Sequence, residues 1–251
     1  MHGGDPFSKE AAEGVQPLNP FERFQHRQGV TVLDGGLATS LEALGYDLAD
    51  DLWSAKVLLE DPDVIQRVHS DFLQAGADCI TAGTYQASIQ GFIARGVVKE
   101  RAVEVLGRAV GLAVEARDAF WSNAENRNQR LRPLVAASVG PYGAYQADGS
   151  EYTGAYGLSD DELLDFHGGR WRVLAESGAD LMGCETVPSL QEAEVLLELL
   201  RRTSDQWAWM SFTCRDGSHL SDGTPLAAAA GMCDAGARVA AVGINCTPPE
   251  H

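Results

Sequence analysis

The sequence has 251 residues, of which 45% are hydrophobic, so it can bury the core of one large domain or two small ones. Its 36 acidic and 19 basic residues give a net charge of −17, and a surface of that sign repels nucleic acids and anionic membranes. These values argue against a nucleic-acid or membrane-surface protein and favour a small molecule as the partner.

Targeting signals and cysteine usage favour the cytoplasm. The N-terminal region lacks the apolar run of a secretory signal, and no stretch approaches the roughly 18 apolar residues of a membrane helix. The five cysteines are an odd number without Cys-x-x-Cys spacing, which suits a reducing compartment. We expect residues 1–20, polar and rich in glycine, to form a mobile tail before one domain over residues 21–251.

Six short apolar segments, each ending on polar residues, have the pattern of buried strands. Segments of helical periodicity lie between them, the longest over residues 97–121. Continuous apolar strands that alternate with helices indicate a parallel sheet covered on both faces. The six expected strands cover residues 29–36, 77–85, 133–140, 179–185, 207–213 and 239–246.

Capping residues mark the helix ends. Asp61-Pro62 has the form of an N-cap followed by a first-turn proline, and Ser159 with Glu162 has the form of a capping box. Ser189 is expected to cap the next helix in the same way. A glycine recurs at three helix-to-strand junctions, where a left-handed residue would end the helix. These glycines are Gly76, Gly178 and Gly236.

Two closures of the sheet compete: an open doubly wound sheet and a (β/α)8 barrel. The glycine pair after Asp34 lacks the spacing of a dinucleotide fingerprint, and the sequence has no P-loop. In a barrel, polar strand ends would converge on the carboxyl face, where such enzymes keep their sites. We therefore predict an α/β fold of the TIM (β/α)8-barrel type, with about six of eight βα units present. The converging residues are Asp34, Thr84, Tyr85, Ser138, Glu185, Thr213, Asn245 and Cys246.

Three of these strand ends carry reactive groups, and each has a second interpretation. The Cys246 thiol is a nucleophile or metal ligand or, as composition alone favours, a small buried hydrophobic group. The Glu185 carboxylate binds a ligand amine or pairs locally. Asp34 binds a ligand or caps the amides of Gly35 and Gly36 in a turn.

Two polar loops after strands are further candidates. Residues 140–157 carry four tyrosines, whose rings would hold a cationic ligand or anchor a mobile surface loop. Residues 215–225 contain His219, which is a ligand, a base or, more commonly in such loops, a solvated side chain. His69 lies within a helix and is expected to be structural. Cys79, Cys214 and Cys233 are expected to be packing residues.

Six motifs in this order resemble the homocysteine S-methyltransferase family, most closely its branch that uses S-methylmethionine or S-adenosylmethionine. Each motif is modest by itself, but the ordered set is highly specific. The resemblance runs from about Val30 to Cys246. The motifs are DGGLAT (34–39), TAGTYQAS (81–88), SVGPYGAY (138–145), CET (184–186), LSDGTP (220–225) and GINC (243–246).

The resemblance implies a zinc-dependent barrel that transfers a methyl group from a sulfonium donor to the zinc-bound thiolate of L-homocysteine, giving methionine. By position, Cys246 matches the family's first zinc thiolate. Asp34 and Glu185 match acidic positions that hold homocysteine. Tyr85 lies where the betaine-using relatives place a residue near the metal, and Asn245 borders the same site. No further catalytic group is implied, because a methyl group on a positive sulfur requires in-line placement more than an acid or a base.

One departure from the family concerns the zinc site. The family completes it with a Gly-Gly-Cys-Cys segment at the eighth strand, which this sequence lacks. We therefore expect a fragment or truncated product of a full enzyme that binds zinc weakly and turns over poorly. Six units would also expose sheet edges and favour association. The alternatives are a non-catalytic barrel that acts as a binding or regulatory module, and a barrel lyase, although the three lysines lie outside the strand ends.

Overall fold

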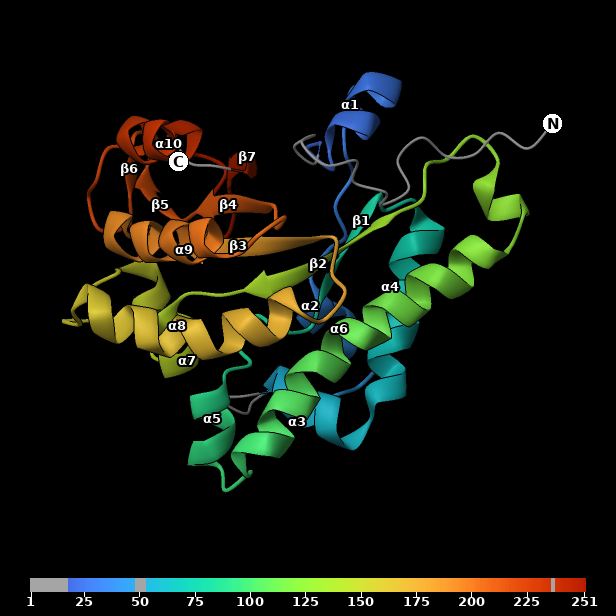
Figure 1. Ribbon diagram of the computed structural model, residues 1–251, viewed down its shortest axis with the longest axis horizontal. Helices are drawn as coiled ribbons and strands as arrows, with labels where there is room; N and C mark the ends of the chain where they lie inside the picture. Colours follow the sequence, from blue (N-terminus) through green and yellow to red (C-terminus); the bar gives the residue numbers. More distant parts are fainter. Residues whose placement is uncertain (1–17, 48–52, 236–237) are drawn as a thin grey trace.

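The computed structural model describes residues 18–47, 53–235 and 238–251. Gly236 and all but the last three residues of the expected tail, 1–20, lie outside these ranges. Five parallel strands form the main sheet, in which each strand neighbours the next of the five along the chain (Figure 1). They are β1 (Cys79–Ala82), β2 (Leu134–Val139), β3 (Leu181–Val187), β4 (Ala208–Phe212) and β7 (Val239–Ile244).

The first expected strand, residues 29–36, is shorter than predicted. Only Leu33 forms a parallel bridge, with Cys79, and the Asp34 amide donates to the carbonyl of the same cysteine at 3.0 Å. Two glycines then turn the chain into α2 (Leu37–Ala43), which ends the pairing. The described sheet therefore has the Leu33 segment at one edge and β7 at the other, and the barrel is not closed between them.

The strand order decides between the two closures. A doubly wound sheet reverses its strand order at a switch point. Here the order follows the chain without reversal from Leu33 through β1, β2, β3 and β4 to β7, which is the order of strands around a TIM barrel. The predicted barrel-type α/β fold is confirmed, and the Leu33 segment with the five strands accounts for the six expected units.

The helices alternate with the strands, and their caps were predicted in part. The Ser159 hydroxyl accepts from the Glu162 amide at 3.3 Å and completes the expected capping box. Asp61 precedes a helix without capping it through its side chain, because its carboxylate accepts from the Tyr46 hydroxyl instead. The other elements are α1 (Glu22–Gln28), α3 (Trp53–Glu60), α4 (Pro62–Ala75), α5 (Ile89–Ala94), α6 (Lys99–Ser122), η1 (Glu125–Arg127), α7 (Tyr142–Gln146), η2 (Ser150–Tyr152), α8 (Asp160–Ala175), α9 (Leu190–Arg202), α10 (Leu226–Ala235) and a hairpin of β5 (Cys214–Asp216) and β6 (His219–Leu220).

Two of the glycine junctions also fix the sheet register. Gly76 (φ 115°) and Gly178 (φ 87°) have the predicted left-handed conformation, which residues with a Cβ rarely adopt. Two residues after each glycine an aspartate leads into a strand. The Asp78 carboxylate accepts from the Val32 amide at 2.9 Å, and Asp180 accepts in the same way from an amide of β2 at 2.8 Å. The repeated Gly-Ala-Asp sequence thus ties each strand to its neighbour at the amino end of the sheet.

Alternate residues of the strands face two different cores. Val135 of β2 packs in the large cluster between the sheet and the outer helices. Leu134 faces the opposite side, which is the inside of the barrel, together with Trp209 of β4. There α1 contributes Phe24 and its N-cap residue, Phe21, whose ring centroid lies 6.0 Å from that of the tryptophan. Helix α1 therefore packs against the inner apolar layer.

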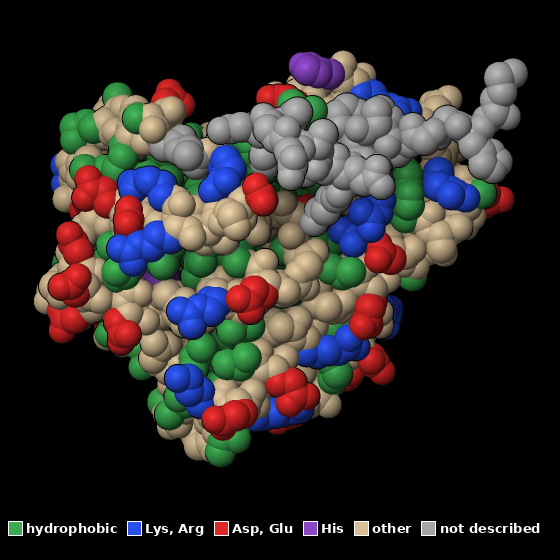
Figure 2. Space-filling view, viewed as in Figure 1, with side chains coloured by type: hydrophobic (Ala, Val, Ile, Leu, Met, Phe, Trp, Pro, Cys, Tyr) green, Lys and Arg blue, Asp and Glu red, His purple; other side chains and the backbone are tan. Residues whose placement is uncertain are grey.

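The surface carries mixed charges. Acidic and basic side chains are interspersed over the face seen in the space-filling view rather than gathered into separate patches (Figure 2). Exposed pairs such as Arg101 with Glu104, 2.7 Å apart, contribute little stability, so the surface charge bears on solubility more than on the fold. Among the described residues, none of the helices combines the length and the apolar character of a membrane span.

Candidate active site

The inner face of the sheet becomes polar toward the carboxyl ends of its strands. Cys79 and Ala136 belong to the inner apolar layer, and two residues beyond them lie Thr81 and Ser138. Because side chains two apart on a strand share a face, these hydroxyls and Glu185 of β3 point to the same side. The carboxyl ends of neighbouring strands meet at one edge, so the structure brings these polar groups together there, as in barrel enzymes.

Asp34 is held by the neighbouring strand. Its Oδ2 accepts from the Thr81 amide at 2.7 Å, and its Oδ1 accepts from the Thr81 hydroxyl at 2.9 Å. These partners differ from the turn amides of Gly35 and Gly36 that the alternative interpretation assigned to it. Burial raises the pKa of Asp34 to about 6, and the bonds from Thr81 oppose the rise. The carboxyl group is therefore fixed in place and titrates near neutral pH.

Glu185 lies on an irregularity of β3. The register against β4 shifts between Cys184 and Val187, and such a bulge turns a side chain away from the regular strand. Burial raises the pKa of Glu185 to about 7. The Ser138 side chain opposes the rise, and the charge of Asp34 adds to it. Its Oε1 is buried without a hydrogen-bond partner. Since a buried acceptor without a donor is costly, this oxygen is available to a ligand amine.

Thr186 and Asn245 join the ends of β3 and β7. The Thr186 amide donates to Asn245 Oδ1 at 2.9 Å, and Asn245 Nδ2 donates to the Thr186 hydroxyl at 3.0 Å. The same hydroxyl lies 3.5 Å from the Cys246 sulfur. Thr186 (φ 61°) and Cys246 (φ 47°) both have positive φ, which is strained for residues with a Cβ and persists where surrounding contacts impose it. Asn245 thus positions Cys246 beside β3.

The Cys246 thiol is exposed, so the buried-hydrophobic interpretation of this residue is wrong. Cys79, Cys214 and Cys233 are buried as expected, and Cys184 is buried too. Among the described residues, no group of three His, Cys, Asp or Glu side chains is arranged to hold a metal ion. Because catalytic zinc takes three protein ligands, the described residues do not make a complete zinc site, although Cys246 is an accessible thiol.

Tyr85 lies next to Thr186 and Cys246. Burial raises the pKa of its phenol above the usual range; a hydrogen bond with Thr186 opposes the rise, and the charge of Cys246 adds to it. A Cβ at Gly140 would clash with the Tyr85 backbone and ring, so glycine is required where β2 ends. Thr186, which the Cys-Glu-Thr motif contained without assigning it a role, therefore links Tyr85, Asn245 and Cys246, and it follows Glu185 directly in the chain.

The tyrosine-rich segment 140–157 is folded, with α7 and η2 within it, so the prediction of a loop is corrected. Three of its tyrosines pack on one another and on Phe166, with centroids of the contacting rings 4.9–5.6 Å apart. These rings pack against protein, which leaves the fourth tyrosine, Tyr152, as the exposed one at 53%. The packed residues are Tyr142, Tyr145 and Tyr156.

A buried carboxylate ties this segment to α8 and α9. Glu192 accepts from the Tyr142 amide at 2.6 Å and from the Tyr156 hydroxyl at 3.1 Å, and lies 2.8 Å from His167 Nε2. Arg170 contacts His167 Nδ1 at 2.8 Å and donates to the carbonyl that opens the segment. We call Glu192, His167 and Arg170 the anchor.

The sequence interpretation missed the anchor. The Ser189 hydroxyl caps α9 through the Glu192 amide as predicted, but the glutamate side chain turns into the protein. Burial and then the charge of Arg170 lower the pKa of His167 to about 4, so the imidazole is neutral and donates from Nε2. His167 and Arg170, three residues apart on α8, share one helix face, which was the available signal.

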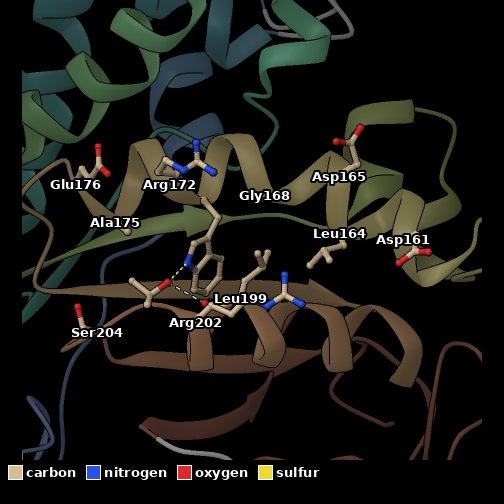
Figure 3. Close-up of a pocket in the computed structure, with 12 residues that line it drawn as sticks. Asp161, Leu164, Asp165, Gly168, Arg172, Ala175, Glu176, Leu199, Arg202 and Ser204 are labelled. Carbon is tan, nitrogen blue, oxygen red and sulfur yellow. Dashed lines mark hydrogen bonds between the residues drawn. The ribbon is translucent and has the colours of Figure 1, made fainter.

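Two other features lie apart from this group. A groove of about 730 Å³ runs between α8 and α9, and its lining includes Asp161, Arg172 and Arg202 but none of the predicted site residues (Figure 3). His219 pairs locally in the hairpin, with Nδ1 2.9 Å from Asp216 Oδ1. Its side chain is partly exposed, but it lies in β6, so the prediction of a polar loop over residues 215–225 is corrected to a short hairpin.

Comparisons with known proteins agree on one family. The sequence model described as homocysteine S-methyltransferase matches residues 31–251. The chain is 49% identical to homocysteine S-methyltransferase YbgG of Bacillus subtilis over 93% of its own length and 74% of that protein. It is 48% identical to the Escherichia coli homocysteine S-methyltransferase over the same shares. The metallated form of the E. coli homocysteine methyltransferase MmuM aligns with a TM-score of 0.88 at 47% identity, covering 92% of this chain and 80% of that one.

Proposed function

The chain belongs to the homocysteine S-methyltransferase family, and we propose that its methyl donor is a sulfonium compound, S-methylmethionine or S-adenosylmethionine. The homocysteine thiol first loses its proton to solvent; its thiolate then attacks the methyl carbon, the bond between that carbon and the donor sulfur breaks, and the electron pair of that bond stays on the donor sulfur. The acceptor becomes methionine, and the donor leaves as a neutral thioether. A positive sulfur is a good leaving group, so placing the two sulfurs in line with the methyl carbon is the main task of the protein.

We propose that Asp34 and Glu185 hold the ammonium group of homocysteine. The unpartnered Glu185 Oε1 carries this proposal, because it is a buried acceptor at the carboxyl ends of the strands that lacks a donor from the protein. The Asp34 carboxyl is already oriented by Thr81. Tyr85 and Asn245 would border the bound amino acid, the former by its ring and the latter by placing Cys246.

We further propose that Cys246 is one ligand of a zinc ion, since its thiol is exposed and lies 3.5 Å from the hydroxyl of Thr186, the residue that follows Glu185. Zinc, when bound, favours the thiolate of a coordinated substrate thiol, whose free pKa is about 8.5. The described residues offer too few ligands to complete such a site, so the other ligands are not assigned. The proposed organisation is one barrel domain over residues 21–251.

The location and the assembly are proposals as well. All five cysteines are free, the state that a reducing compartment maintains, and on this basis we propose a cytoplasmic location. Apolar side chains are exposed at both sheet edges, with Leu33 at 45% and Ile244 at 49%, and we propose that these edges are sites of association. The expected partners besides other protein copies are the small-molecule substrates.

The test measures zinc content and homocysteine methylation by S-methylmethionine on the same samples. The samples are the 251-residue chain, the same chain extended by a segment that supplies a Gly-Gly-Cys-Cys sequence, and the extended chain with Cys246→Ser. We expect about one zinc per extended chain together with turnover, and the loss of both in the variant. An extended chain with neither zinc nor turnover would refute the proposed donor and metal.

A further inference from the structure

The 3-10 helix η2 is built against the candidate active site. The Thr213 hydroxyl, at the end of β4, donates to the Glu151 carbonyl at 3.4 Å. A Cβ at Gly143 would clash with the backbone of Ser150 and Glu151, so glycine at that position lets α7 and η2 pack closely. Glu151 is therefore held by backbone contacts on both sides, from the sheet and from α7.

The anchor fixes both ends of the segment that carries Glu151. Glu192 of the anchor accepts hydrogen bonds from the Tyr142 amide at the start of α7 and from the Tyr156 hydroxyl after η2. Because all three anchor residues are at most 1% exposed, their bonds are shielded from water and hold the segment in one position before any ligand binds. A carboxylate on this segment is thus placed by the fold and needs little ordering when a ligand arrives.

The Glu151 side chain has a free acceptor next to two aromatic rings. Its Oε2 is buried and has no hydrogen-bond partner. The exposed Tyr152 is its neighbour in the chain, and Tyr85 lies near enough that the charge of Glu151 raises the pKa of its phenol. Glu151 is hydrogen-bonded to Thr213, and the carbonyl of the residue before that threonine, Phe212, accepts from the Asn245 amide at 3.1 Å. The segment that carries Glu151 and Tyr152 therefore lies beside the end of β7, where the exposed Cys246 follows Asn245.

A carboxylate beside aromatic faces is the arrangement that recognises an organic cation. We propose that Glu151 is the residue that selects a positively charged methyl donor, by placing its carboxylate against the sulfonium. The inference rests on the proposed function, and it separates two roles. Asp34 and Glu185 bind the ammonium group of homocysteine, and Glu151 binds the positive sulfur of the donor, a charge that homocysteine does not carry. This charge disappears when the methyl group leaves, so the same contact favours release of the neutral product.

The test compares two ligands that differ only in the sulfonium. Binding of S-methylmethionine and of methionine is measured by calorimetry on the whole protein without homocysteine, so that no transfer occurs. Glu151→Gln should weaken S-methylmethionine binding about tenfold and change methionine binding by less than about twofold. Glu151→Asp, which keeps the charge, should recover part of the loss. Asp161→Asn removes an exposed carboxylate from α8 and should change neither.

The binding measurements on Glu151→Gln support or overturn the proposed role of Glu151. Equal weakening of both ligands in Glu151→Gln would show that the residue binds the amino acid part or supports the fold, and would overturn the proposal. Unchanged binding of both ligands would overturn it too. In the extended chain, the variant should raise the KM for S-methylmethionine and leave that for homocysteine unchanged. If the unmodified protein fails to bind S-methylmethionine, the proposed donor is wrong, which is a separate result from the failure of Glu151 alone.

Discussion

Two glutamates that lie close together in the sequence, Glu192 and Glu185, differ in how their carboxylate oxygens are satisfied. In the anchor, the Glu192 carboxylate has three partners and is fully buried. In the candidate active site, Glu185 keeps a buried oxygen without a partner, and its pKa is raised to about 7. Burial of a carboxylate therefore does not by itself mark a site. The unmet hydrogen-bonding capacity does, because a ligand can relieve it.

The largest expected effect tests the anchor. Glu192→Ala would leave Arg170 without its counter-charge and Tyr142 and Tyr156 without an acceptor, so the free energy of unfolding should fall by about 3–5 kcal/mol. Urea denaturation measures the change. Glu194→Ala removes an exposed carboxylate from the same helix and should cost less than about 0.5 kcal/mol. Equal losses in the two variants would remove the distinction between the anchor and the surface.

Replacing the unsatisfied carboxylate should have the opposite sign. The folded-state pKa of Glu185 lies above its usual 4.5, so ionisation destabilises the fold as the pH rises from about 4.5 to about 7. Glu185→Gln should therefore raise the free energy of unfolding at about pH 8 by on the order of 2 kcal/mol, and by little at about pH 4. Denaturation at both pH values measures this. Destabilisation at the higher pH would mean that the carboxylate already has an unrecognised partner.

The pH dependence of substrate binding should follow the same two groups. As the pH falls, Glu185 loses its charge near its pKa of about 7 and Asp34 near its pKa of about 6, so the ammonium of homocysteine loses both partners. The value of kcat/KM for homocysteine should fall about tenfold from about pH 7.5 to about pH 6. In Glu185→Gln the step near pH 7 should disappear, leaving the step near 6. A profile identical in the two proteins would exclude Glu185 from homocysteine binding.

The smallest expected effect concerns a buried base without partners. His69 of α4 is 1% exposed, neither ring nitrogen has a partner, and burial lowers its pKa to about 4. Its neutral form is the stable one, so stability is complete above about pH 6.5 and declines as the pH falls toward about 4. His69→Leu should add about 1 kcal/mol near pH 5.5 relative to the parent, whereas the exposed His26→Leu should not. Thermal melts across this pH range provide the measurement.

Residues with local partners were the ones that the sequence predicted well. The capping box at Ser159 and the left-handed Gly76 and Gly178 depend on chain neighbours within a few residues, and they are present as expected. The strand positions followed from continuous apolar runs. The segment 29–36 was the exception. A full strand there would pair with neighbours on both sides, and among the described residues it has a neighbour, β1, on one side only.

Residues with distant partners were decided by the tertiary structure. The sequence placed polar residues at strand ends, and the parallel order of the strands then gathered Asp34, Glu185 and Cys246 at one edge. It did not show that Cys246 is exposed, that the tyrosines of 140–157 pack on Phe166, or that Glu192 turns inward. The Glu192 carboxylate meets a backbone amide 50 residues away, so its role depends on how helices and strands pack. Periodicity and capping are properties of neighbouring residues, whereas the satisfaction of a buried polar atom depends on every element that surrounds it.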